Sequence, residues 1–169
     1  MARAAVRAAA HGAEPPPLSA DLPPRLLVPA GAFVSLHVRD ALRGCVGSIE
    51  PQGPLAALVA RMAVAAATTD PRFPAVRPEE LSVVRVEVSV LSSPRPVTPE
   101  DVDPRMHGLC LRLGGRGAVM LPQAAIRYGW DRATLLAELC EKAGLPAGAW
   151  NDPGAVLLAF TVDPIEGEV

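Results

Sequence analysis

Apolar and polar residues alternate over several short stretches of the chain, a pattern typical of β-strands. The stretches "AFVSLHV" and "LRGCVGSI" flank residues 39–41 and predict a β-hairpin. Further along, "HGLCLRLGGRGAVMLP" predicts a second hairpin with Gly114-Gly115 at its turn. Paired strands of this kind indicate antiparallel sheet.

Two further stretches read as single strands. "LSVVRVEVSVLS" places valines on one face, and "AVLLAFTVD" is apolar enough for a buried final strand. The polar positions on the other face of the first of these strands are Arg85, Glu87 and Ser89.

Helical patterns occur between the strands. "GPLAALVARMAVAAATTD" predicts a mostly buried helix of about four turns, which starts after Pro54 and ends before Asp70-Pro71. "DRATLLAELCEKAGLP" predicts a second helix with an Asp131 cap and a stop at Gly144. Hairpins with inserted helices indicate an α+β fold, built mainly on antiparallel sheet.

The length of 169 residues suits a single domain, with room for a larger and a smaller lobe. Residues 1–30 are expected to form a short amphipathic helix followed by a proline-rich wrap, because prolines exclude helix and central strand there. The folded domain is expected to span residues 31–169.

The register of the first hairpin follows from its hydrophobic pattern. With residues 39–41 as the loop, Ser35 lies opposite Cys45 and His37 lies opposite Arg43. A two-residue loop would mix apolar and polar side chains on both faces, so the pattern favours the three-residue loop. One face of the hairpin is then core, and the other carries these four polar residues.

Composition excludes several classes of protein. Half of the residues are apolar and the net charge is −2, so a disordered chain and a nucleic-acid-binding protein are both disfavoured. The longest apolar run is interrupted by Arg61 and falls short of the roughly 20 residues that span a bilayer, so no membrane association is expected.

Three cysteines with no CxxC pair fit a reducing cytoplasm. The few histidines are not clustered, so no metal site is expected. No GxGxxG, P-loop or HExxH motif is present, and no cofactor is expected.

The strongest candidate for chemistry is Cys45, between Gly44 and the strand residues that follow. A thiol reacts as its thiolate, and Arg43, on the same strand face about 6.6 Å along the chain, can stabilise that form or bind an anion. Gly44 and Gly47 allow a substrate or a second backbone to approach closely. Alternatively, Cys45 is a small buried residue without reactivity.

Histidines supply the candidate bases. His107 precedes a predicted strand and is the first candidate, and His37 is the second because the register places it opposite Arg43. Alternatively, His107 forms a hydrogen bond with the loop before it.

Three polar residues are candidates for substrate binding. Asp70 and Arg72 in "TTDPRFP" can bind an anion or align a base, although Asp70 can equally satisfy amides of the turn at Pro71. Gln123 is expected at a strand end, where its amide suits a pocket rim.

The order of motifs resembles the AMMECR domain family. The resemblance is carried by "LRGCVGSIEPQGPL", "DPRFPAVRPEEL", "VEVSVLSSP", "HGLCLRLGGRGAVMLPQ" and "CEKAGLPAGAW", and it spans essentially the whole chain. It implies an AMMECR-like α+β fold, but no established activity. It also implies two partners of the AmmeMemoRadiSam system, a Memo-type protein and a radical SAM protein.

Two functions remain open at this point. In the first, the protein is a cysteine-dependent enzyme with Cys45, Arg43 and His107 in catalysis, acting on a small-molecule or modified-protein substrate. In the second, it is a non-catalytic binding or scaffold module that uses the Arg43 to Gly47 strand as an interface.

Overall fold

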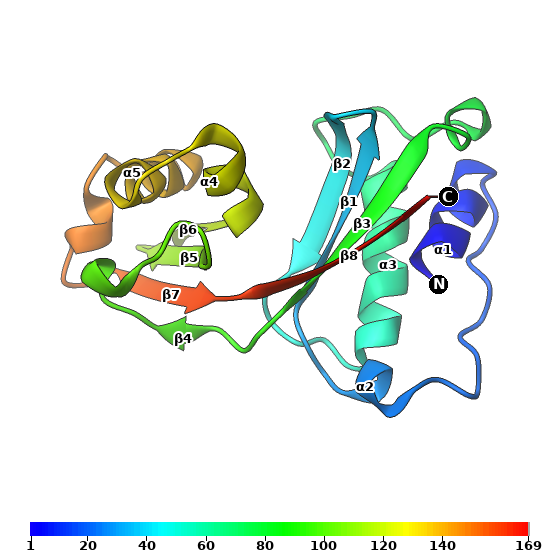
Figure 1. The fold of residues 1–169 in the computed structure, drawn as a ribbon, viewed down its shortest axis with the longest axis horizontal. Coiled ribbons are helices and arrows are strands. Elements are labelled where there is room, and N and C mark those ends of the chain that lie inside the picture. The colour runs from blue at the N-terminus through cyan, green and yellow to red at the C-terminus, as the bar shows by residue number, and fades with distance from the viewer. Residues whose placement is uncertain (169) are drawn as a thin grey trace. The chain divides into compact units, whose positions relative to one another are not determined.

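The computed structural model of the chain describes residues 1–168, and the side chains of residues 1–165 (Figure 1). The chain forms two compact units, one made of Met1–Leu91 together with the residues from Asp163 onward, the other of Ser92–Val162. The second unit is therefore an insertion into the first. The N-terminal segment, residues 1–30, belongs to the first unit, and α1 contributes Ala2, Ala5 and Val6 to its core.

The first unit is built on a four-stranded sheet with the strand order β2-β1-β3-β8. Strand β1 pairs antiparallel with β2 on one side and with β3 on the other. The bounds of the strands are Ala41–Ser48 (β2), Ala32–Val38 (β1), Val84–Leu91 (β3) and Val162–Glu168 (β8). Strand β2 is an edge strand, so one side of its backbone has no neighbouring strand.

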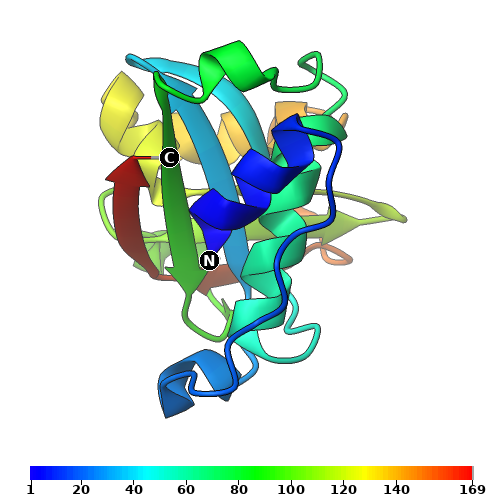
Figure 2. The ribbon, with the colours of Figure 1, turned by 90° about the vertical axis from the view of Figure 1, so that its right-hand side faces the viewer.

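Helices cover one face of this sheet (Figure 2). The long helix α3 (Leu55–Thr68) and the N-terminal helix α1 (Ala2–Ala10) bury their apolar side chains against β1 and β3. A short helix, α2 (Pro24–Leu27), ends the proline-rich segment, and a 3-10 turn, η1 (Pro78–Glu80), precedes β3. The expected strands and the long helix are confirmed here, together with the N-terminal helix.

The register of the first hairpin is partly as predicted. Ser35 lies opposite Cys45, but His37 lies opposite Leu42, so the prediction that it faces Arg43 was wrong. The turn has two residues, with Arg39 at a φ of 55°, and a bulge shifts the register between Leu36 and His37. The bulge takes up one residue, so the faces stay sorted although the loop is short.

The second unit has a four-stranded sheet of its own, in the order β4-β7-β5-β6, with helices packed on it. The bounds of the strands are Arg95–Pro96 (β4), Val156–Phe160 (β7), Gly108–Leu113 (β5) and Arg116–Met120 (β6). The bounds of the helices are Pro99–Asp101 (η2), Pro122–Tyr128 (α4), Arg132–Lys142 (α5) and Ala149–Asn151 (η3).

Local signals in this unit act as predicted. Gly114 and Gly115 turn the β5–β6 hairpin with φ values of 57° and 78°, and Asp131 caps α5 by accepting a hydrogen bond from the Thr134 amide at 2.8 Å. Gln123 was expected at a strand end but lies in α4. The helix starts at Pro122, a residue that suits the first helical position.

The chain enters the second unit at Ser92 and leaves it just after Thr161, and these two residues form two hydrogen bonds with each other. The Ser92 amide donates to the Thr161 carbonyl at 3.0 Å, and the Thr161 amide donates to the Ser92 Oγ at 2.9 Å. Both residues belong to the second unit, so its first residue lies beside its last but one. Among the described residues, no helix is long and apolar enough to cross a membrane.

Candidate functional site

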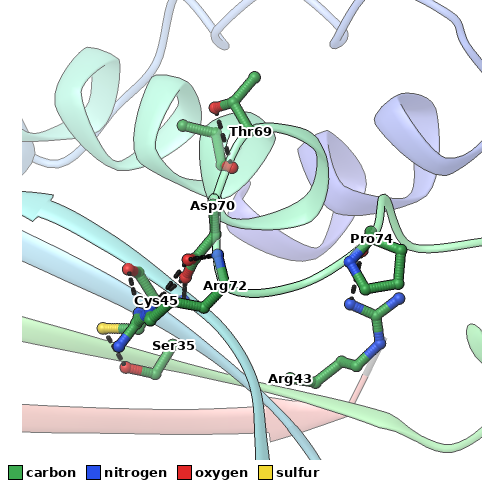
Figure 3. A network of polar contacts seen from close by, with 8 residues as sticks. Ser35, Arg43, Cys45, Thr69, Asp70, Arg72 and Pro74 are labelled. Carbon is green, nitrogen blue, oxygen red and sulfur yellow. Dashed lines mark hydrogen bonds and ion pairs between the residues drawn. The ribbon is translucent and has the colours of Figure 1, made fainter.

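The backbone of Cys45 is held from the open side of the edge strand. Its N–H donates to the Asp70 Oδ2 at 2.8 Å, and its carbonyl accepts a hydrogen bond from the Arg72 Nη2 at 3.1 Å (Figure 3). These are the contacts that a neighbouring strand would otherwise make. An acidic and a basic side chain therefore complete the edge of the sheet at Cys45.

The loop after α3 positions this pair. Asp70 follows the helix end and lies before Pro71, and it accepts hydrogen bonds from the Arg72 amide at 3.1 Å, from Nε at 2.9 Å and from Nη2 at 2.7 Å. The side chain of Asp70 is 2% exposed and that of Arg72 is 52% exposed. The hydrogen bonds from Arg72, together with that from the Cys45 amide, hold the pKa of Asp70 far below its usual range, although burial opposes this.

The sulfur of Cys45 has two polar neighbours. The Ser35 hydroxyl donates to Sγ at 3.2 Å from the directly opposite position on β1. The pKa of Arg72 is raised, chiefly by Asp70 and to a smaller extent by its interactions with Cys45, so its guanidinium is a cation beside the thiol. Cys45 as a whole residue is only partly buried. Its backbone is therefore fixed on both sides, and a cation lies beside it.

Further polar residues continue from Cys45 across the sheet. Ser35 on β1 lies opposite both Cys45 on β2 and Glu87 on β3, so all three share one face. Glu87 lies 3.7 Å from the His37 Nε2 and accepts a hydrogen bond from the Ser89 Oγ at 3.3 Å. His37 follows Ser35 by two residues on β1 and so lies on the same face, but the bulge between Leu36 and His37 shifts it relative to Cys45. This face opposes the one that packs on α3.

Ser35, Glu87 and Ser89 were not predicted to belong to the site. The alternation of β3 marked the last two as outward-facing, but only the pairing of β3 with β1 brings them to Cys45. Sequence alternation within one strand does not tell which strand lies beside it.

Arg43 lies away from the sulfur and is used structurally. Its Nε and Nη2 donate to the Glu80 carboxylate at 2.8 and 3.1 Å, and Nη1 and Nη2 donate to the carbonyls of Pro74 and Ala75 at 2.8 and 3.2 Å. Figure 3 shows its guanidinium directed to Pro74 and not to Cys45. Arg43 is also the main cause of the lowered pKa of Glu80. The cation beside the thiol is therefore Arg72.

The two glycines of the motif are required by packing. A Cβ on Gly44 would meet the carbonyl oxygen of Ala66 in α3, and a Cβ on Gly47 would meet the ring of Phe33. Both positions are thus filled by the protein's own atoms. Their close approach was predicted, and the neighbours are a helix backbone and an aromatic ring.

His107 and Gln123 belong to the second unit. The Nδ1 of His107 accepts a hydrogen bond from the Asp103 amide at 3.1 Å, which is the alternative in which this ring supports the loop before it. His107 also lines two hollows of the second unit, of about 470 and 230 Å³. The residues brought together within the first unit are Ser35, His37, Cys45, Asp70, Arg72, Glu87 and Ser89.

The part of the chain that the structure describes contains no cluster of potential metal ligands. Nowhere in it do three or more His, Cys, Asp or Glu side chains gather as they would around an ion. The chemical capacity of the site is that of a thiol, a guanidinium and a histidine–carboxylate pair.

Replacement of Asp70 by Asn should destabilise the protein by about 2 kcal/mol at pH 7, because a neutral amide replaces the buried carboxylate that accepts the hydrogen bonds from Arg72 and Cys45. The folded-state pKa lies below the ordinary 3.8, so this contribution is fully present above about pH 4 and is lost as the pH falls further. Urea unfolding at pH 7 and pH 3 should show the difference between the variant and the parent narrowing in acid. Asp21→Asn, at an exposed position, is the control, and an unchanged difference at pH 3 would contradict the assignment.

These observations define a class of protein: an α+β chain in which a four-stranded antiparallel unit, with a cysteine on its braced edge strand, carries an inserted second sheet. The chain belongs to the AMMECR1 family, whose model matches residues 1–165. The resemblance noted in the sequence is thereby confirmed, and so is the fold.

Archaeal relatives agree with this assignment. A protein of Thermococcus gammatolerans is 42% identical over 166 residues, which cover 92% of this chain and 80% of the relative. A protein of Methanothermobacter thermautotrophicus is 40% identical, with 95% and 87% covered. The crystal structure of the uncharacterized protein PH0010 from Pyrococcus horikoshii has a TM-score of 0.94 and 34% identity, and it covers 99% of this chain and 88% of its own.

Proposed function

We propose that the protein is a thiol-dependent enzyme in which Cys45 is the nucleophile or a thiol ligand. The observation that carries the proposal is the arrangement around this residue, whose amide and carbonyl are held by Asp70 and Arg72 while the residue itself is only partly buried. A reactive cysteine needs a fixed position, access and a neighbouring cation. An inert core cysteine also has a fixed position, but it has neither the access nor the cation.

His37 is the base that the first unit supports. It shares the sheet face of Cys45, and Glu87, 3.7 Å from its Nε2, would balance the positive charge that the ring gains with a proton. In this step the imidazole would receive the proton of the thiol, and the Ser35 hydroxyl, which donates to the sulfur, would stabilise the thiolate that is left. His107 is the second candidate for the base, because its Nδ1 already accepts a hydrogen bond from the Asp103 amide.

Arg72 also indicates the class of substrate. About half of its side chain is exposed although it is bonded to Asp70, so its outer edge can bind an anionic group next to the thiol. We propose a small molecule or a modified protein that carries such a group. A Memo-type protein and a radical SAM protein are proposed as partners, and that part is supported by the family resemblance alone.

A binding or scaffold module that docks a partner along the Arg43 to Gly47 strand is the alternative. Docking by strand addition would need free backbone groups on the open side of β2. At Cys45, the N–H and carbonyl groups on that side are bonded to Asp70 and Arg72. This observation favours the enzyme.

Alkylation with iodoacetamide near pH 7, followed residue by residue with mass spectrometry, tests the proposal. Replacement of Arg72 by Gln should slow the labelling of Cys45 about tenfold, because it removes the guanidinium that holds the Cys45 carbonyl and lies beside this residue. Arg77→Gln, in the same loop but 77% exposed, should change the rate by less than about twofold.

The other two cysteines are internal controls for folding. Cys110 and Cys140 are 3% and 0% exposed, so their labelling reports unfolding and not reactivity. Equal rates for Cys45 in the Arg72 and Arg77 variants, with the other two protected, would contradict the proposed site. Intact-mass detection of a substrate adduct that Cys45→Ser does not form would identify the reaction.

A further inference from the structure

A hollow lies in the first unit, on the opposite face of the sheet from Cys45. Its volume is about 410 Å³, within the range of sites that bind small molecules. Most of its wall is aliphatic and comes from the helices, β3 and β8. The main apolar residues are Leu26, Val59, Val86, Val88, Val90 and Ile165.

The hollow exists because the helices do not cover the whole sheet face. Val84 and Val86, near the start of β3, are 2% exposed, whereas Val88 and Val90 further along the strand are only partly buried. Ile165, on the other side, is 59% exposed. Aliphatic surface left open in this way gains free energy when an apolar group displaces water from it.

Charged residues also line this hollow. Among the described residues that line it, Arg3 from α1 and Arg25 from α2 are cationic and Asp163 from β8 is anionic. Long arginine side chains can contact an apolar ligand with their methylene groups while the guanidinium binds an anion. The combination matches a molecule with an apolar tail and a negative head.

We infer that this hollow binds an amphiphile with a single aliphatic chain and a terminal carboxylate. The chain would lie against the valines of β3, and the carboxylate would lie beside Arg3 and Arg25. The inference is independent of the thiol chemistry proposed for Cys45, since the two sites occupy opposite faces of the sheet.

Decanoate is the probe, titrated into the full-length protein with methyl NMR as the readout. We expect saturable shifts of Val88, Val90 and Ile165. The double variant R3E/R25E should bind decanoate about tenfold or more weakly, while its affinity for uncharged 1-decanol should stay the same. Arg7→Glu, an exposed position on α1 outside the hollow, is the matched control and should stay within about twofold.

A blocked hollow gives a second test. Val88→Phe should lower the affinity for both probes at least tenfold, and Leu26→Trp, at a partly exposed position on α2, serves the same purpose if the first variant does not fold. The inference is overturned if decanoate gives no saturable shifts, if R3E/R25E binds it as the parent does, or if the blocked variants still bind.

The same protein samples also distinguish two other possible ligands of the hollow, a second copy of the chain and membrane lipid. Protection of the hollow's methyl groups in a dimer of the free protein, seen by sedimentation, would assign the surface to a second copy of the chain. Co-sedimentation with phosphatidylglycerol vesicles without binding of free decanoate would assign it to membrane lipid. Either result would overturn a soluble carboxylate as the ligand.

Discussion

Gly44→Ala is expected to lower the free energy of unfolding by about 3 kcal/mol or more, which corresponds to a fall in Tm of about 6–12 °C. The added methyl group would overlap the carbonyl oxygen of Ala66, which is fixed in the backbone of α3 and cannot rotate away. Differential scanning calorimetry and urea unfolding would measure the effect.

The backbone origin of this clash allows a sharp control. Ala66→Gly removes only a side chain, so it should not rescue Gly44→Ala. Gly154→Ala, where the nearest atom is the Asp152 Oδ1 at 3.3 Å, should cost less than about 1 kcal/mol. A fully stable Gly44→Ala protein would instead leave the glycine available for a substrate.

Replacement of Arg43 by Ala is the second large effect, with an expected loss of about 3 kcal/mol at pH 7. The side chains of Arg43 and Glu80 are 15% and 22% exposed, and the guanidinium also binds the Pro74 and Ala75 carbonyls. Removal of Arg43 leaves these acceptors without their donor in a partly buried site. Urea unfolding measures the loss.

The shape of the guanidinium is essential in this arrangement. Lys cannot bind two carboxylate oxygens and two carbonyls from one planar group, so Arg43→Lys should recover less than half of the lost stability. Alkylation of Cys45 in the still-folded Arg43→Lys protein should proceed at nearly the parent rate. A rate that falls as far as in Arg72→Gln would return Arg43 to the thiol site.

The strands were predictable because their signal is local. Alternation and turn residues define β1, β2 and the Gly114-Gly115 hairpin without reference to the rest of the chain. The two-residue turn with a bulge was missed, because a bulge leaves the hydrophobic pattern of a longer loop intact. Helix α4 was missed because it has only seven residues, and its first residue, Pro122, ends the stretch that predicts the preceding strand.

The site was less predictable because it depends on pairing and on loop closure. Cys45 was found from its motif, but the choice between Arg43 and Arg72 as its cation depends on where residues 70–80 fold. The bulge at Arg43 and the presence of Glu80 take one guanidinium away, and Asp70 brings the other in. Glu87 joins the site only through the β1–β3 pairing.

The hydrogen-bonded pair Ser92 and Thr161 has a consequence for how the protein is made and how it can change. During translation the inserted segment is complete before the host sheet receives β8, its last strand. Because the inserted segment begins and ends at neighbouring residues, its length or sequence can change during evolution without moving the strands of the host sheet. The strands that carry Cys45 would keep their alignment throughout.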